Sequence, residues 1–434
     1  MFTKKFSIII PFYNSKKYLK NALNSIVNQK RHNIEIILVD DASKDKSIKL
    51  ISKFKKKFKY IKILRNKINS GVGFSRNKAL KNAKGKYIIF LDSDDYLFPK
   101  SLLKLENFIK KKNFPDVVVL KHKKTTYPVT NSKLLKDLDY KKKSSEKFIK
   151  YLYKKEVPFS DCWFIAVKRS MILQNNIFFP NTHFGESEYF VSKTICFMRS
   201  YSCFNQNFYF KNDRIKSLNN IESLTATVSV LENLSKLTQL LKNKKLILSK
   251  REFIKKYFKN GLGLFNTLLA LRNFNELKKI SKFIYKNKNY FKNVQLGKKY
   301  DNFFSLLKKK NIFSSLIKYY EKIIKTKIIE IKKIKSYKDI YVYSKSKYST
   351  AIIKIMKKEK FKIKGIIDDS IIFKNEQFLN YKIMNIKEFA RNTRDKMNET
   401  GIIITHPKLI IVKKIMKSLK NLGFKNDQII SVKF

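Results

Sequence analysis

The stretch KYIIFLDSDDYL, Lys86 to Leu97, runs from an apolar segment straight into three carboxylates, Asp92, Asp94 and Asp95. The chain as a whole is short of acid, with 33 Asp and Glu against 97 Lys and Arg. Like charges this close together repel one another, and burying them without a partner costs several kcal/mol or more. The sequence therefore predicts that a positive group lies beside this cluster.

Composition indicates a folded protein of more than one domain. The 434 residues are 43% hydrophobic and include 36 Phe and 23 Tyr, which is ample material for packed interiors. At this length two or three domains are expected. The cysteines, Cys162, Cys196 and Cys203, are odd in number and have no metal-binding spacing, which favours a reducing compartment over a disulfide framework.

No segment of the sequence has the features of a membrane span or of a secretory signal. Its apolar stretches fall short of the ~18 residues that a spanning helix needs. The first residues, MFTKKFSIIIPFYN, are basic at the start, but their apolar run is short and no small-residue cleavage site follows. We expect a cytoplasmic protein, or one bound peripherally at the inner membrane.

The formal charge of +64 raises the question of a nucleic-acid partner. Lys, Asn, Ile and Phe are abundant throughout the chain, as AT-rich codons produce, and the lysines are spread rather than clustered. No zinc finger, helix-turn-helix or aromatic RNA-binding signature accompanies them. We expect no nucleic-acid partner, and infer instead an attraction to anionic phospholipid and anionic substrates.

The first third of the chain alternates between expected strands and helices. Strands are expected at 6–12, 34–40, 60–66, 86–92 and 116–120, with helices at 14–29, 47–58 and 74–83 and a further helix beginning at Pro99. This alternation predicts an α/β fold with a doubly wound, parallel or mixed sheet. In such sheets ligands bind beyond the carboxyl ends of the strands.

Four successive strands deliver polar or glycine residues to that edge. They are Tyr13 and Asn14 after the first, Asp40 and Asp41 after the second, Asn69, Gly71 and Gly73 after the third, and the three aspartates after the fourth. Hard oxygen ligands such as Asp92 and Asp94 suit Mg²⁺ or Mn²⁺. Such an ion bridges the two phosphates of a nucleoside diphosphate and offsets their charge. We expect it to be the missing positive partner.

The rest of the chain divides into a helical region and a second α/β segment. Residues 223–334 read as amphipathic, lysine-faced helices, for which a core stripe and a solvated face are favoured over a helix lying on a membrane. Residues 335–434 restart the strand–helix alternation. The loop YSKSKYS after its first strand has no glycine for the approach of a pyrophosphate, which favours a structural or docking module over a dinucleotide-binding domain.

Four ordered motifs resemble those of the family 2 glycosyltransferases, which have the GT-A fold. They are SIIIPFYN, IEIILVDDASKD, NSGVGFSRNKALKNAKGKYIIFLDSDD and the later acid cluster FGESEYF. The resemblance implies a GT-A domain over 1–222, followed by the helical region 223–334. Residues 335–434 resemble the Rossmann-like appendages of some bacterial members.

The resemblance also implies an activity. It is that of a metal-dependent, hexosyltransferase-type enzyme that transfers a sugar with inversion from a nucleotide-diphosphate donor. The acceptor would be a growing capsule or lipooligosaccharide, as a glycan or lipid-linked glycan. The alternative is a non-catalytic, nucleotide-sugar-binding subunit of a polysaccharide assembly complex.

Roles for individual residues follow from the same resemblance. Asp40 would contact the nucleobase near Tyr13 and Asn14, Asp92 would serve the ribose or the metal, and Asp94 would bind the metal directly. The remaining residues assigned to the nucleotide-sugar site are Pro11, Asp41, Arg76, Asn77 and Arg214. The alternative for Arg76 is a helix-surface position, and for Asn14 and Asp45 it is helix capping, which we prefer for Asp45. Trp163 would stack on an acceptor sugar or, as an equal alternative, lie in the core.

Inversion is a single displacement and needs one base for the acceptor hydroxyl. In the family this base is the Asp of a Glu-Asp pair ahead of a helix. Here Glu186 matches the Glu, but Ser187 stands where the Asp is expected. Glu188 is therefore the first candidate and Glu186 the second. The alternative is that both acids favour the helix N-terminus through its dipole, while His183 is interpreted as a loop residue.

Overall fold

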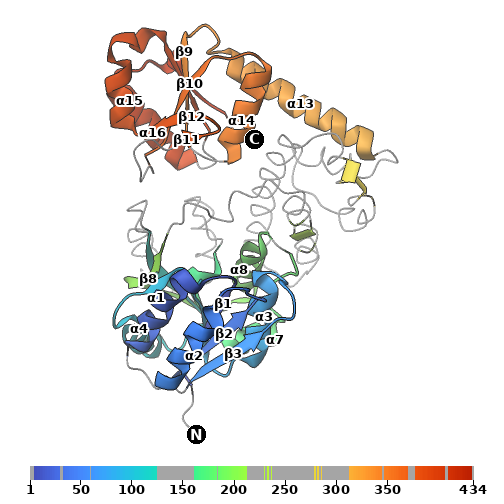
Figure 1. Cartoon of the computed structure of the whole chain (residues 1–434), viewed down its shortest axis with the longest axis vertical. Coiled ribbons are helices and arrows are strands. Elements are labelled where there is room, and N and C mark those ends of the chain that lie inside the picture. The colour runs from blue at the N-terminus through green and yellow to red at the C-terminus, as the bar shows by residue number, and fades with distance from the viewer. Residues whose placement is uncertain are drawn as a thin grey trace. The chain divides into compact units, whose positions relative to one another are not determined.

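The computed structural model describes residues 4–29, 33–58, 60–124, 161–182, 184–212, 312–344, 347–369, 377–405 and 409–432, and isolated helical positions between 229 and 285. Contacts divide the chain into two compact units. The first comprises Met1–Ser217 with Glu232–Phe258, and the second comprises Leu218–Leu231 with Lys259–Phe434. Figure 1 shows the ribbon of each unit.

An eight-stranded mixed sheet forms the first unit, in the order β3-β2-β1-β4-β7-β6-β8-β5. Its strands are β1 (Phe6–Phe12), β2 (Ile34–Asp40), β3 (Ile61–Arg65), β4 (Tyr87–Phe90), β5 (Tyr96–Leu97), β6 (Val117–Lys124), β7 (Ile165–Lys168) and β8 (Tyr201–Lys211). Every residue of β1 and of β2 is buried, as expected for central parallel strands covered on both faces. The predicted doubly wound α/β fold is confirmed.

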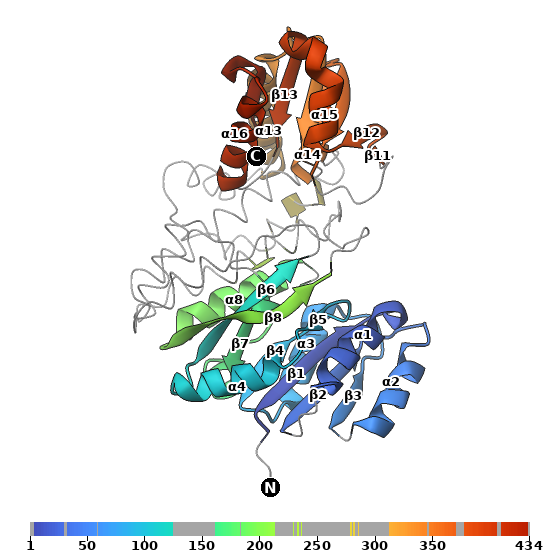
Figure 2. The same ribbon diagram turned by 90° about the vertical axis from the view of Figure 1, so that its left-hand side faces the viewer.

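Helices cover both faces of this sheet. They are α1 (Lys16–Val27), α2 (Ser47–Lys57), α3 (Val72–Asn82), α4 (Ser101–Lys111), α7 (Arg169–Gln174) and α8 (Glu186–Phe197), with the short 3₁₀ helix η1 (Cys162–Phe164). Figures 1 and 2 show α1, α2 and α4 on one face and α3 on the other. Helix α1 buries Leu19, Ala22, Leu23 and Ile26, a spacing that forms one stripe on a helix.

Strand directions decide which ends share an edge. Strands β3, β2, β1 and β4 are parallel neighbours, β7 is antiparallel to both β4 and β6, and β6 is parallel to β8. The carboxyl ends of β1, β2, β3, β4, β6 and β8 therefore lie at one edge, together with the amino end of β7. We call this the carboxyl edge.

The start of α4 differs from the prediction that placed Pro99 in its first turn. The helix begins at Ser101, and Lys100 before it has a left-handed backbone with φ 58°. Pro99 thus belongs to the turn that leads into the helix. Because proline fixes only its own φ and restricts the residue before it, it does not set the helix start two residues later.

A six-stranded sheet forms the second unit, in the order β11-β12-β10-β9-β13-β14. Its strands are β9 (Asp339–Tyr343), β10 (Ile363–Ile367), β11 (Gln377–Phe378), β12 (Tyr381–Met384), β13 (Thr400–Ile404) and β14 (Ile429–Ser431). Its helices are α13 (Ile312–Lys332), α14 (Lys347–Lys358), α15 (Ile386–Thr393), α16 (Leu409–Asn421), and the 3₁₀ helices η4 (Arg394–Glu399) and η5 (Asn426–Gln428). One apolar cluster joins α13 and α14 to the sheet, and another joins α15 and α16 to it.

The second α/β segment predicted for 335–434 is present in this sheet. The residue after β9, Ser344, has φ 89°, a backbone region that favours glycine, although the sequence offers serine there. Most of the helical region predicted at 223–334 lies outside the described residues, so the three-domain division stays a prediction. Among the helices that the structure describes, none is both long enough and apolar enough to cross a bilayer.

Candidate functional site

The aspartates after β4 meet a positive side chain that the protein itself supplies. The Arg76 Nη2 on α3 donates to Asp92 Oδ1 at 2.9 Å, and its Nη1 donates to Glu186 Oε1 on α8 at 2.9 Å. Arg76 is only 4% exposed, so the helix-surface interpretation is wrong. One buried guanidinium thus connects the carboxyl edge, α3 and the start of α8.

Burial changes the pKa of both Arg76 and Glu186. It opposes the charge of Arg76, but Cys162, Asp92 and Glu186 raise the pKa of the guanidinium above its ordinary value. Burial raises the pKa of Glu186, and Arg76 offsets part of this rise. Glycine at 73 leaves room for the same contact, because a Cβ there would lie 3.1 Å from Glu186 Cγ, tighter than most packing contacts.

Asp95 is buried and bonded to the carboxyl end of β8. The Tyr209 hydroxyl donates to Asp95 Oδ2 at 2.6 Å, and the Asn212 N–H donates to Oδ1 at 2.8 Å. The same hydroxyl accepts the N–H of Asp92 at 3.2 Å. Burial, together with the charges of Asp92 and Asp94, raises the pKa of Asp95 to about 7.

Lys211 is a second cation of the candidate site, and it was not predicted from the sequence. Its Nζ lies 5.1 Å from the centre of the Trp163 ring. Burial alone would lower its pKa, but nearby carboxylates raise it above the ordinary value; they are Asp92, Asp95, Asp161 and Asp94. The predicted cation, Arg214, lies outside the described residues. Lys211 could have been found as the last residue of the long β8 strand.

The metal site predicted at Asp92 and Asp94 has two carboxylates to offer. Within the described part of the chain, no three or more His, Cys, Asp or Glu side chains are grouped to hold a metal ion. Mg²⁺ commonly takes one or two carboxylates and completes its shell with water and substrate phosphates. The Asp92 side chain is 25% exposed, so an oxygen-rich pair of this kind fits such an ion, which stays a prediction.

Asp40, predicted to contact the nucleobase, has no exposed surface. Its Oδ1 accepts the Ser43 N–H at 2.8 Å, and its Oδ2 lies 3.0 Å from Arg65 Nε. These contacts join the end of β2 to the following turn and to β3. A role in base recognition stays a prediction.

Asp41 shapes the loop that leads into α3. Its Oδ1 accepts from Asn66 Nδ2 at 2.8 Å and from the Ser70 N–H at 2.9 Å, and its Oδ2 accepts the Gly71 N–H at 2.8 Å. Gly71 has φ 90°, a conformation that side chains disfavour. The Asp41 carboxylate and Gly71 together fix the loop that leads into α3, the helix that carries Arg76.

The end of β1 contributes one exposed aromatic residue and one loop connector. Tyr13 is 43% exposed. Asn14 has φ 47°, its N–H donates to Ser43 Oγ at 2.9 Å, and its Oδ1 accepts the Lys44 N–H at 2.9 Å. Asn14 therefore joins two loops instead of capping α1. Pro11 lies within β1, opposite Val39.

Asp45 is a helix cap, as preferred from the sequence. Its Oδ2 accepts the Lys16 N–H at 3.0 Å, and its Oδ1 accepts the Ser47 N–H at 3.0 Å. Lys16 and Ser47 are the first residues of α1 and α2. One carboxylate thus satisfies amides at two helix starts, and the capping interpretation is confirmed.

Asn77 and Trp163 have structural surroundings that the sequence did not specify. The Asn77 amide donates to the Phe179 carbonyl at 2.8 Å and accepts the Phe179 N–H at 2.8 Å, which engages both of its ends. Trp163 is 3% exposed and stacks on Tyr209, with ring centres 4.7 Å apart. These surroundings are those of a core tryptophan. Nucleotide binding by Asn77 and acceptor stacking by Trp163 stay predictions.

The first turn of α8 holds both acids that were candidates for the base. Gly185 precedes the helix with φ 73°. Glu186 turns inward to Arg76, and Ser187 Oγ accepts the Cys162 N–H at 2.7 Å. Both Glu186 and Glu188 lie where the helix dipole favours acids. A catalytic role for either stays a prediction, and His183 lies outside the described residues.

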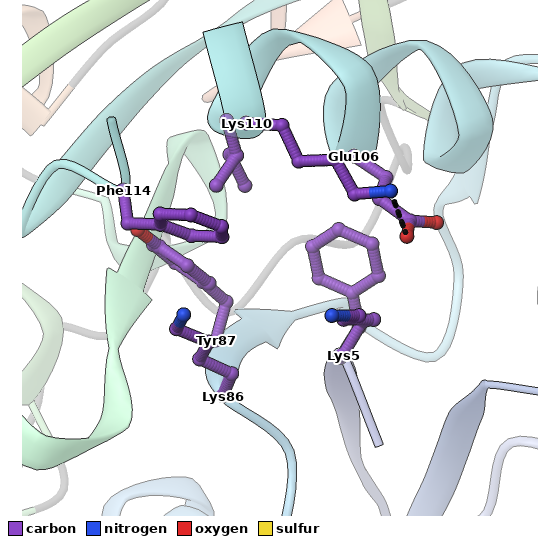
Figure 3. Close-up of a pocket in the computed structure, with 8 residues that line it drawn as sticks. Lys5, Lys86, Tyr87, Glu106, Lys110 and Phe114 are labelled. Atoms are coloured by element: carbon purple, nitrogen blue, oxygen red, sulfur yellow. Dashed lines mark ion pairs between the residues drawn. The ribbon is translucent and has the colours of Figure 1, made fainter. Parts of the chain in front are cut away.

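A small recess lies at the opposite end of the sheet. Figure 3 shows Lys5, Lys86, Tyr87, Glu106, Lys110 and Phe114 around it. It adjoins the amino ends of β1 and β4, and it is bordered by the Lys110–Glu106 ion pair at 3.4 Å and by Lys86 Nζ, 3.5 Å from the centre of the Phe114 ring. Because parallel sheets bind ligands beyond their carboxyl ends, we do not assign the site to this recess.

Comparison with known proteins agrees with this geometry. The model of the family described as glycosyl transferase family 2 matches residues 7–174. The poly(ribitol-phosphate) beta-glucosyltransferase of Bacillus spizizenii is 43% identical over 122 residues, which are 27% of this chain and 19% of that enzyme. Against that enzyme the chain therefore spans about a fifth of the relative's length.

Another relative aligns with almost the whole chain. The cholesterol galactosyltransferase of Borreliella burgdorferi is 29% identical over 405 residues, 89% of this chain and 98% of that enzyme. Among solved structures, S. aureus TarS 1–349 in complex with UDP-GlcNAc gives a TM-score of 0.55 at 22% identity, over 73% of this chain and 89% of that one. At this identity the likeness shows a shared fold.

Proposed function

We propose, because residues 7–174 match the model of glycosyl transferase family 2, that the chain transfers a sugar from a nucleotide-diphosphate donor to an acceptor hydroxyl, with inversion at the anomeric carbon. The observation that carries this proposal is the carboxyl edge. There Asp92 and Asp94 follow β4, and Arg76 ties Asp92 to the start of α8. Parallel α/β sheets bind nucleotides at this edge.

The donor we propose is a uridine diphosphate sugar. TarS, whose fold the chain shares, was solved with UDP-GlcNAc, which supports this nucleotide. The exposed ring of Tyr13 at the end of β1 offers a stacking surface for the base. The half-buried lysine at the end of β8, Lys211, offers a charge for the diphosphate. Pro11, Asp40, Asp41, Asn77 and Arg214 remain proposed members of this donor site.

We propose that Asp94, with Asp92, holds Mn²⁺ or Mg²⁺ when the donor is bound. When bound, such an ion supplies positive charge to the departing diphosphate. Asp92 already shares its carboxylate with Arg76, which leaves Asp94 as the principal ligand. Arg76 holds the Asp92 carboxylate in position, so the pair of carboxylates is in place before a metal ion arrives.

The acceptor we propose is a glycan or lipid-linked glycan of a capsule or lipooligosaccharide, with Trp163 near the acceptor side. Relatives named as poly(ribitol-phosphate) glycosyltransferases support a polymeric acceptor of this kind. The formal charge of +64 supports a reaction that takes place at the anionic inner face of a membrane, to which a basic protein is attracted. The base for the acceptor hydroxyl is predicted from the sequence to be Glu188 or Glu186.

A lipid hydroxyl is a second candidate acceptor. The relative that aligns with 89% of this chain, and therefore with both units, is named as a cholesterol galactosyltransferase. The donor would then be a galactose nucleotide and the product a sterol glycoside. A non-catalytic subunit is the alternative that Ser187 keeps open, because serine replaces the acid expected at the base position.

The proposal is tested by sugar transfer with the full chain. UDP-GlcNAc, UDP-glucose and UDP-galactose are each supplied with Mn²⁺ and one of three acceptors: lipooligosaccharide, poly(ribitol phosphate), or phosphatidylcholine vesicles that contain cholesterol. We expect one donor and acceptor pair to give a product of inverted anomeric configuration by nuclear magnetic resonance. Asp94→Ala should abolish it, whereas Asp116→Asn, on a carboxylate that caps amides before β8 at the opposite edge, should not. Full activity in Asp94→Ala, or a retained configuration, would contradict the proposal.

A further inference from the structure

The residue at the expected base position, Ser187, accepts a hydrogen bond from the backbone. Its Oγ accepts the N–H of Cys162 at 2.7 Å. A serine hydroxyl accepts a proton poorly unless another group takes its own proton. Ser187 therefore ties the start of α8 to η1, and the base for the proposed transfer must come from another side chain.

Neither acid of α8 is well directed for that task. Glu186 is 9% exposed and its Oε1 is bonded to the buried Arg76. Residues two apart on a helix are about 200° apart around its axis, so Glu188 faces away from the side that meets Arg76 and Asp92. The Glu188 Oε2 lies beside Gly185, 3.7 Å from where a Cβ on that residue would be.

Asp161 brings a carboxylate to the same place from a different element. It directly precedes Cys162, whose N–H is the one held by Ser187. Strand β7 follows η1 and runs antiparallel to β4, so its amino end, and Asp161 with it, lies at the carboxyl edge. Asp161 is also partly exposed, as a group that must meet a substrate has to be.

Electrostatics place Asp161 in the same cluster as the aspartates after β4. Asp92, Asp95, Asp161 and Asp94, in decreasing order of effect, raise the pKa of Lys211 against the opposing effect of burial. Its Nζ lies 5.1 Å from the ring of Trp163, two residues after Asp161. One lysine therefore faces both the predicted metal-binding acids and Asp161.

We infer that Asp161 is the catalytic base, held at the carboxyl edge by the bond between Cys162 and Ser187. As the acceptor oxygen forms its bond to the anomeric carbon, its proton passes to the Asp161 carboxylate. The bond from that carbon to the diphosphate breaks, and its electron pair leaves with the diphosphate. This inference rests on the proposed function and names the residue that completes it.

The test compares Asp161→Asn with the wild-type full chain. UDP release is measured with UDP-galactose and cholesterol-containing phosphatidylcholine vesicles, and with UDP-GlcNAc and octyl glucoside. Donor binding is measured in parallel by calorimetry. Because general base catalysis contributes about 10²–10⁴-fold, we expect kcat to fall at least ~100-fold while the donor Kd changes less than ~3-fold. Adding Ser187→Asp to Asp161→Asn restores a carboxylate beside the Cys162 amide, and we expect it to recover part of kcat.

Asp116→Asn is the matched control, because Asp116 is a partly exposed aspartate at the opposite edge of the sheet. Its kcat should equal that of the wild type. If the wild type is active and Asp161→Asn keeps its kcat, or if Glu188→Gln alone loses activity, the inference is overturned and the proposed function stands. If the wild type neither binds UDP nor releases it from either donor, the proposed function fails and this inference with it.

Discussion

At the scale of single residues, the site is organised by one buried arginine. Arg76 is held between Asp92 and Glu186, on a strand end and a helix start far apart in the sequence. It also lies 5.2 Å from the Phe179 ring, and its Nε has no partner in the part of the chain described. Buried charges of this kind persist only when each is paired, so the three side chains form one unit.

Arg76→Met should therefore destabilise the first unit strongly. Removing the guanidinium leaves Glu186 buried without its counter-charge, a change that costs about 3–5 kcal/mol when one member of a buried pair is lost. Urea unfolding followed by circular dichroism measures this loss. The control, Arg76→Lys, keeps the charge but cannot bridge both acids at once, and it should lose less stability than Arg76→Met. Equal stability of Arg76→Met and the wild type would contradict the assigned bridge.

Asp95 gives the stability a pH dependence of defined sign. Its pKa is raised to about 7 in the folded chain, above the ordinary value of about 3.9 for an unfolded Asp. The contribution of Asp95 to the free energy of unfolding is fully present below the pKa of the unfolded chain and is lost as pH rises through about 7. In buffer with EDTA, the melting temperature should fall between pH 5 and pH 8. In Asp95→Asn, the part of this decrease in melting temperature that Asp95 causes should be absent. If the melting temperature of Asp95→Asn falls as steeply with pH as that of the wild type, the raised pKa of Asp95 is contradicted.

At the scale of elements, the strands were predictable because their signal is local. Runs such as FSIIIPF and IEIILVD became fully buried strands, and the aspartates after β4 lie at the expected edge. Several contacts that connect these aspartates to the rest of the site were not predictable, because they join residues more than 100 positions apart, such as Tyr209 with Asp95 and Glu186 with Arg76. Strand β5 was missed because two residues carry no periodic pattern.

Asp45 permits a test at this scale, because it caps two helices at once. Asp45→Ala removes the acceptor for the Lys16 and Ser47 amides, and the loss of one cap costs about 0.5–2 kcal/mol. We expect a loss toward the upper end of that range, measured by urea unfolding. Asp45→Asn keeps the acceptor oxygen, so it should lose only a few tenths of the stability that Asp45→Ala loses. If both variants match the wild type, the double cap contributes nothing.

At the scale of the whole molecule, the chain has two compact units with separate sheets and separate apolar clusters. The residues of the proposed donor site all belong to the first unit. Scanning calorimetry should therefore resolve two unfolding transitions, of which UDP with Mn²⁺ raises only one, because a ligand stabilises the unit that binds it. A single transition, or an equal shift of both, would show that the units do not unfold independently.

The central claim is that the acids after β4 bind a nucleotide diphosphate through a divalent cation. Thermal unfolding of the wild type and of Asp94→Ala, each with UDP alone and with UDP and Mn²⁺, tests it most directly. We predict that Mn²⁺ increases the stabilisation by UDP in the wild type and does not in Asp94→Ala. The same Mn²⁺-dependent shift in both proteins would contradict the claim.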